Sequence, residues 1–174
     1  MVAKKKRTTK AKTRATKKAK APDLWELIEE AWTKTAPKLA KARAKPTEDN
    51  VDALDAAAED VMETLKKALD KLDKAALLAV DRQLERALFR IDRQEIQEVT
   101  DGSDDGFLYA RGFIVAMGKT FYDAVDAKPK RAVCDAECEE MCYLPWHLYR
   151  EKFGEPPSSP ISRESCSNEA GWED

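Results

Sequence analysis

The chain has few of the residues on which many enzymes and secreted proteins depend. Its 174 residues include one histidine, four cysteines and six glycines. No hydrophobic run approaches the roughly 18 residues that suggest a membrane-spanning helix, and no apolar stretch typical of a signal peptide follows the N-terminus. The four cysteines also lack the dense, loop-rich setting of a small secreted scaffold. We therefore expect reduced thiols, no membrane association and a cytoplasmic location.

Acidic residues are missing from the first 22 positions, although they are abundant elsewhere. Residues 1–22 contain ten basic side chains and no acidic one. The rest of the chain holds 21 basic and 33 acidic side chains, so the overall charge of −2 conceals a charge of −12 on residues 23–174. The tail is a low-complexity mixture of Lys, Ala, Thr and Arg with nothing to bury, so we predict that it is disordered.

A cationic tail of this kind attracts polyanions, and nucleic acid is the most obvious candidate, either DNA or RNA. Base recognition is not expected, because no aromatic side chain that could stack on a base interrupts the tail. Two alternatives stay open: the tail contacts the acidic body or keeps it soluble, or the run at residues 4–7 is a transport signal. The basic residues predicted to contact nucleic acid are Lys4, Lys5, Lys6, Arg7, Lys10, Lys12, Arg14, Lys17, Lys18 and Lys20.

Apolar residues recur at helical spacing through the rest of the chain, and no segment has the two-residue period of a strand. Asp23 is placed to cap the first helix, Pro37 and Pro46 bound a loop with one helical turn, and Gly154 ends the last helix. The expected helices span residues 24–32, about 50–72, 74–98 and 104–125, and a helical stretch from about 130 to 153 in which Pro145 introduces a kink or restart.

The predicted fold class is therefore all-α, with a single compact domain of five to six helices. This domain covers residues 23–155, and an irregular segment at 156–174 associates with it. The helix at 104–125 is the most apolar and is expected to lie at the centre. Gly112, Ala116 and Gly118 in it indicate close contact with a neighbouring helix.

Thr100–Gly118 combines turn signals, polar side chains and an apolar helix more closely than any other segment. The D-x-S-x-D-G pattern at residues 101–106 matches the first half of a calcium-binding helix-loop-helix. Gly112, however, stands where that loop requires a bidentate glutamate. The favoured interpretation is a helix N-terminus on which Ser103 or Asp104 accepts hydrogen bonds from unpaired amides.

Arg111 follows this turn by two helical turns, so an acidic residue of the turn, Asp104 or Asp105, could pair with it. Such a pair would fix the turn. The alternative is a ligand, partner or catalytic site, since paired carboxylates can act as acid and base. No catalytic role is assigned, and the candidate site residues are Asp101, Ser103, Asp104, Asp105, Tyr109 and Arg111.

Two further patterns are weak. Gly118-Lys119-Thr120 resembles the end of a phosphate-binding loop, but the preceding glycine is one residue too far away. Cys134, Cys138 and Cys142 would stack on one helix face with the outer pair about 12 Å apart along the axis, which is too far for one zinc ion. We predict no bound metal and no cofactor. Small buried side chains are the favoured role of these cysteines, with redox sensing, or a zinc site of two thiols and His147, as alternatives.

Four stretches resemble a known family: LWELIEEAW, TDGSDDGFLYARGFIVAMG, ECEEMCYLPWHLYREKFG and the closing GW. Together they are similar to the bacterial domain of unknown function numbered four-two-four-zero, over residues 23–172. The resemblance implies a small, helical, cytosolic bacterial domain without an established activity, so it transfers no catalytic residue. The basic tail lies outside the shared region.

The leading hypothesis is a non-enzymatic helical interaction domain with a cationic arm for weak, sequence-independent association with nucleic acid. Its location would be the cytoplasm, with association to the nucleoid. The alternative is an enzyme or small-ligand domain that uses the acidic turn at 101–111. A protein partner or self-association remains open.

Overall fold

The computed structural model describes residues 22–100 and 102–172 of the chain. Within these residues the chain forms eight α-helices, three short 3-10 helices and no strand. The prediction of a single compact all-α domain is confirmed, although the helices are more numerous than expected. The basic tail, apart from Pro22, and Asp101 lie outside the described residues.

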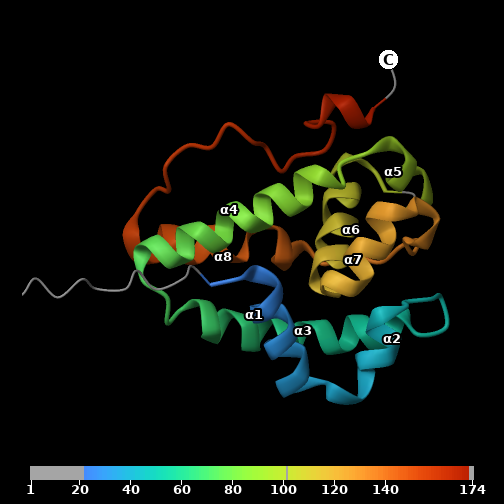
Figure 1. The fold of residues 1–174 in the computed structure, drawn as a ribbon, viewed down its shortest axis with the longest axis horizontal. Helices are drawn as coiled ribbons and strands as arrows, with labels where there is room; N and C mark the ends of the chain where they lie inside the picture. Colours follow the sequence, from blue (N-terminus) through green and yellow to red (C-terminus); the bar gives the residue numbers. More distant parts are fainter. Residues whose placement is uncertain (1–21, 101, 173–174) are drawn as a thin grey trace, which may run out of the picture.

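Helices α4 and α8 pack against each other, with the α1–α3 group below them and the α5–α7 group at one end in Figure 1. Helices α1 and α3 pack together on one side, whereas α6 packs against α4 and α8. The elements in chain order are α1 (Leu24–Thr35), η1 (Pro37–Leu39), α2 (Ala40–Ala44), α3 (Val51–Leu69), α4 (Lys74–Arg90), α5 (Gln94–Thr100), α6 (Asp104–Ala116), α7 (Lys119–Ala127), η2 (Pro129–Arg131), α8 (Glu139–Phe153) and η3 (Glu169–Gly171).

The first helix forms as its sequence predicts. The Asp23 carboxylate accepts a hydrogen bond from the Trp25 amide at 2.9 Å, which satisfies one of the free N–H groups at the start of α1. The apolar stripe of α1 is buried, and the Trp32 indole N–H donates to the Ala116 carbonyl at 2.7 Å. This bond ties the first helix to the end of α6.

The predicted helix at 74–98 is two helices, which corrects the sequence-based boundary. α4 ends at Arg90 and α5 begins at Gln94. Between them Asp92 is fully buried, and its carboxylate accepts hydrogen bonds from the amides of Cys166 at 3.1 Å and Asn168 at 2.9 Å. Periodicity along the chain could not reveal a break that is stabilised by residues more than 70 positions away.

The predicted helix at 104–125 is likewise divided into α6 and α7. Gly118 lies between them with a φ of +91°, a conformation that strongly favours glycine. Arg43 donates to the Met117 carbonyl at 2.8 Å and so satisfies the end of α6. The close contact with a neighbouring helix predicted at Gly112 is confirmed, because a Cβ atom there would lie 2.6 Å from the Cys142 sulfur of α8 and 2.3 Å from the Cys138 carbonyl oxygen just before that helix.

The predicted start of the last helix, at about residue 130, is also wrong, because α8 begins at Glu139. Between residues 128 and 138 only η2 is helical. Residues 132–138 are irregular because they dock on α6, where the Cys138 amide donates to the Tyr109 carbonyl at 3.0 Å. Pro145 cannot donate the helical bond to Met141, yet α8 runs through it to Phe153. The packing of α8 against α4 and α6 holds this continuous helix in place.

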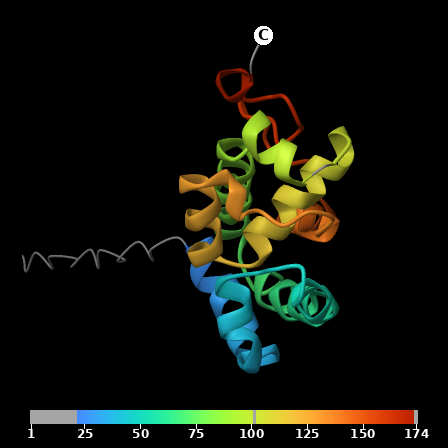
Figure 2. The same cartoon turned by 90° about the vertical axis from the view of Figure 1, so that its right-hand side faces the viewer.

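Residues 155–172, here called the C-terminal segment, cross the surface formed by α4 and α8 and end beside α5 (Figure 1). A view turned by 90° places this segment and the α1–α3 group on opposite sides of the molecule (Figure 2). The segment ends with Trp172, whose ring packs edge-on against Phe107 at a centroid distance of 5.8 Å. None of the helices described here is both long enough and apolar enough to span a bilayer.

Candidate functional site

The acidic turn predicted from the sequence forms the N-terminus of α6. The Ser103 hydroxyl accepts a hydrogen bond from the Gly106 amide at 3.3 Å, which confirms the predicted cap. Asp105 is exposed in the first turn of α6, and Asp104 is the first residue of the helix. The carboxylate of Asp105, near the start of this helix, also stabilises it through the helix dipole.

Tyr109 lies one turn further along and is half-buried. Partial burial and the nearby carboxylates of Glu139 and Asp105 raise the pKa of its hydroxyl. The Glu137 carboxylate also approaches this end of α6, at 3.2 Å from the position that a Cβ atom of Gly106 would occupy. The surroundings of Tyr109 are therefore acidic, and they keep its phenol protonated.

Arg111 belongs to the same helix but enters the core. Its side chain is 0% exposed, donates to the Leu88 carbonyl at 3.0 Å and to the Ser165 hydroxyl at 3.1 Å, and lies above the Phe107 ring. Its carboxylate partner is Asp92, at 3.9 Å. The sequence predicted that Arg111 pairs with Asp104 or Asp105 of the turn. Its partner is instead Asp92, which lies between α4 and α5.

Burial lowers the pKa of Arg111, and the Asp92 carboxylate opposes this effect. The guanidinium joins three parts of the chain: the end of α4, the middle of α6 and the C-terminal segment. The structure therefore places Ser103, Asp105 and Tyr109 near the surface and Arg111 in the interior. Two cavities, of about 480 Å³ and 580 Å³, are lined by other residues.

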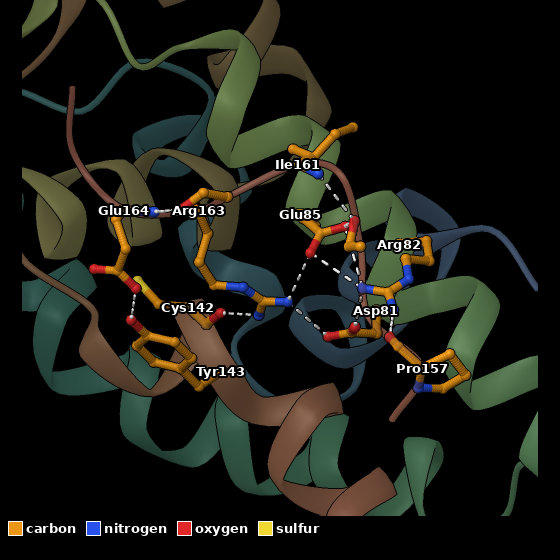
Figure 3. Close-up of polar contacts among 11 residues, drawn as sticks. Asp81, Arg82, Glu85, Cys142, Tyr143, Pro157, Ile161, Arg163 and Glu164 are labelled. Atoms are coloured by element: carbon orange, nitrogen blue, oxygen red, sulfur yellow. Dashed lines mark hydrogen bonds and ion pairs between the residues drawn. The ribbon is translucent and has the colours of Figure 1, made fainter. Parts of the chain in front are cut away.

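A second group of charges, absent from the sequence-based candidates, lies where the C-terminal segment crosses α4 and α8 (Figure 3). Arg163 extends from that segment between the two helices and is buried. Its guanidinium lies 3.1 Å from the Asp81 carboxylate and 3.7 Å from the Glu85 carboxylate, and it donates to the Cys142 carbonyl at 2.7 Å. It also lies above the Tyr143 ring.

Arg82 supplies the second cation of this cluster. It lies 3.1 Å from the Glu85 carboxylate and 3.5 Å from that of Asp81, and it donates to the Pro157 carbonyl. Burial raises the pKa of Asp81, whereas the ion pair and hydrogen bond with Arg163 lower it. Two carboxylates and two guanidiniums neutralise one another, so the arrangement fastens the C-terminal segment to the helices.

One signal in the sequence could have revealed this cluster. Asp81 and Glu85 share a helix face with Leu77, Leu84 and Leu88, and all five side chains are buried. Carboxylates on a buried stripe require cationic partners, because burying an unpaired charge is costly. The partner could not be chosen from periodicity, since Arg163 lies 82 residues from Asp81 in an irregular segment.

A cavity of about 580 Å³ lies beside this cluster, between α8 and the C-terminal segment. Tyr143, Trp146 and His147 contribute rings to its wall, and Pro156 and Pro157 lie in the segment that also lines it. The rings of Tyr143 and His147 stack at a centroid distance of 5.8 Å. The cavity thus offers aromatic surfaces, while the charges beneath it are engaged in ion pairs.

The cysteines do not form the predicted helical stack, because only Cys142 lies in a helix. Its thiol donates to the Leu108 carbonyl at 3.3 Å, and no disulfide joins the four cysteines. Within residues 22–100 and 102–172, no three His, Cys, Asp or Glu side chains are grouped so that they could hold a metal ion. Burial raises the pKa of Cys138 to about 11 and that of Cys142 to about 12.

These pKa values predict an order of thiol reactivity. Because the thiolate is the reactive form, Cys142 should be alkylated last and the exposed Cys166 first when the folded protein is treated with iodoacetamide near neutral pH. Peptide mass spectrometry after timed quenching measures the order, and protein unfolded in urea serves as the control in which all four react at similar rates. Early modification of Cys142 in folded protein would contradict the packing described for α6 and α8.

The fold and its charges define a small all-α domain that a C-terminal segment closes by ion pairs. The chain belongs to the family described as "Protein of unknown function (DUF4240)", whose model matches residues 20–151. No curated protein and no solved structure matches the chain. The match includes the Ser103 cap and Arg111 but ends before Arg163 and Trp172, so it is shorter than the resemblance expected from the sequence.

Proposed function

We propose that the protein is a non-enzymatic helical interaction domain whose cationic tail associates weakly with nucleic acid, independently of base sequence. One observation carries this proposal: ten basic and no acidic side chains at residues 1–22 precede a body with a charge of −12. Such a tail releases counterions from the phosphate backbone when it binds, which makes the association favourable at low salt. The proposed location is the bacterial cytoplasm, in contact with the nucleoid.

The separation of charge also favours the tail as the point of contact. An acidic body repels the phosphate backbone as a whole, whereas a chain of 22 residues can extend to about 70 Å and reach beyond the body's field. The tail contains no aromatic residue, so its contacts would be with phosphate groups rather than with bases. Binding to DNA and RNA of unrelated sequence is therefore expected.

The alternative function, an enzyme or small-ligand site at residues 101–111, receives less support from the described side chains. Ser103 is engaged in capping α6, and Arg111 is engaged with Leu88, Asp92 and Ser165 in the interior. A site would require these polar groups to face a ligand. The paired core arrangement of Arg111 supports a role in folding instead.

Deletion of residues 1–21 tests the proposal. We expect the dissociation constant for a fluorescent DNA duplex of about 20 base pairs to rise at least about tenfold near 50 mM salt, because most of the cations that face phosphate are removed. Fluorescence anisotropy measures the change. A chain with the same tail residues in scrambled order is the matched control and should bind like the unmodified chain. Equal affinity of the deleted and unmodified chains would refute the proposal.

A further inference from the structure

Two stretches of the acidic body contain basic residues and no acidic ones. Residues 31–47 include five basic side chains, and residues 127–134 include three. They are separated by 79 residues that contain many acidic side chains. These basic residues are Lys34, Lys38, Lys41, Arg43 and Lys45 in the first stretch and Lys128, Lys130 and Arg131 in the second.

The fold brings the two stretches together. Helix α2, from the first stretch, contacts α7, and η2 of the second stretch directly follows α7 (Figures 1 and 2). A cavity of about 480 Å³ lies between them, and Lys45, Lys130 and Arg131 all line it. Its apolar lining includes Val99 and Phe121. Lys45 thus shares one hollow on the surface with Lys130 and Arg131, two adjacent cations that are remote from it in sequence.

The cations of this hollow are available to a ligand. Four cations have no carboxylate of the described residues within 4.0 Å of their charged nitrogen atoms: Lys41, Lys45, Lys130 and Arg131. All four side chains are exposed. Arg43 of the first stretch differs, because it is buried and paired with Glu29 at 2.6 Å. The four cations without an ion pair therefore lie outward, while Arg43 supports the fold.

Acidic residues limit the field of the hollow without cancelling it. Glu48 and Asp49 also line the cavity, so its lining carries three positive and two negative charges. Lys41, in α2 before Lys45, and Lys128, which directly precedes η2, belong to the same two stretches and add to their positive charge. The excess positive charge is spread over a surface instead of being concentrated at one buried point.

We infer that this surface, the α2–η2 groove of Lys41, Lys45, Lys130 and Arg131, is a second binding site for the phosphate backbone of nucleic acid. Exposed cations spread over two segments suit a row of phosphates better than a single one, because each contact is weak and several must add. This inference rests on the proposed function and gives the tail a partner site on the body. When the tail and the groove bind the same nucleic acid molecule, the second contact is intramolecular. Its high effective concentration would strengthen the overall binding.

A charge-matched pair of variants of the full chain tests the inference. One variant carries Lys45→Gln, Lys130→Gln and Arg131→Gln; the control carries Lys66→Gln, Lys71→Gln and Arg86→Gln, which removes three exposed cations elsewhere. We expect the groove variant to raise the dissociation constant for a DNA duplex about fivefold near 50 mM salt. The negative slope of log K against log salt, where K is the association constant, should become shallower by about 2. The control should change the dissociation constant less than about twofold.

The possible results separate this inference from the proposed function. If the groove variant and the control bind equally while both retain strong salt dependence, the groove is not a site and the tail proposal stands. If the unmodified chain binds no duplex, both are overturned. Equal melting temperatures of the three proteins establish that altered binding does not arise from altered folding.

Discussion

Replacement of Arg111 with alanine is expected to lower the free energy of unfolding by about 4 kcal/mol. The side chain is among the largest that are fully buried, so its removal leaves a cavity. It also leaves the Leu88 carbonyl and the buried Asp92 carboxylate without their guanidinium partner. Loss of one member of a buried ion pair is among the most destabilising single changes.

Urea denaturation followed by circular dichroism measures this effect, and Asp105→Asn is the matched control. Asp105 is exposed on the same helix, so its change should alter the free energy of unfolding by less than about 0.5 kcal/mol. If Arg111→Ala does not fold, Arg111→Lys, which retains a cation, should fold with reduced stability. Wild-type stability of Arg111→Ala would mean that Arg111 is free to serve a ligand, as the alternative function requires.

Replacement of Arg163 with alanine is expected to lower the free energy of unfolding by about 3 kcal/mol and to release the C-terminal segment. After the change, Arg82 is the one cation of this cluster that still pairs with the carboxylates of Asp81 and Glu85. The Asp81 side chain is only 1% exposed, so water does not replace the lost partner. Like-charge repulsion between the two carboxylates would then be opposed less, and the Cys142 carbonyl would lose its donor. The bonds that fasten the segment to α4 and α8 would be weakened together.

Limited proteolysis with mass spectrometry detects release of the segment, because cleavage within residues 155–172 should become faster than in the unmodified protein. Arg150→Ala is the control: its guanidinium forms an ion pair with Glu155 at 2.9 Å, but both side chains are largely exposed. Such a pair contributes at most about 1 kcal/mol. If both variants are cut at the same rate as the unmodified chain, the cluster does not fasten the segment.

Local chemistry in the sequence was sufficient to predict the helical class and several helix ends. The Asp23 and Ser103 caps depend on neighbouring amides, and the buried stripe of α1 depends on spacing within one helix. The breaks in the predicted helices at 74–98 and 104–125 depend on other parts of the chain. Asp92 binds amides of the C-terminal segment, and Arg43 binds the end of α6.

The candidate site was predictable only in part for the same reason. The sequence marked Arg111 as important and required an acidic partner, but the partner came from the break after α4 instead of the nearby turn. Three residues of Thr100–Gly118 thus help to build the domain: Ser103 begins α6, Arg111 secures it and Gly112 allows residues 132–138 to approach it. The segment lies within the family match, which links these folding roles to the region that defines the family.

The free cations of the body could not be recognised as a site from their positions in the chain. Lys45 and Arg131 are 86 positions apart, and each acid-free stretch alone is short. Only packing of α2 against α7 places them around one cavity. The basic, acid-free composition of residues 1–22 and the positive charge of the groove together favour a polyanionic partner.

The salt dependence of nucleic-acid binding tests the central claim most directly. Anisotropy titrations of the full chain with one DNA duplex, at salt concentrations from about 50 to 200 mM, give the slope of log K against log salt. Ten tail cations that contact several phosphates predict a steep negative slope, about −0.9 for each phosphate contacted, and a shallower slope after deletion of residues 1–21. No binding at the lowest salt, or a slope that the deletion leaves unchanged, would contradict the claim.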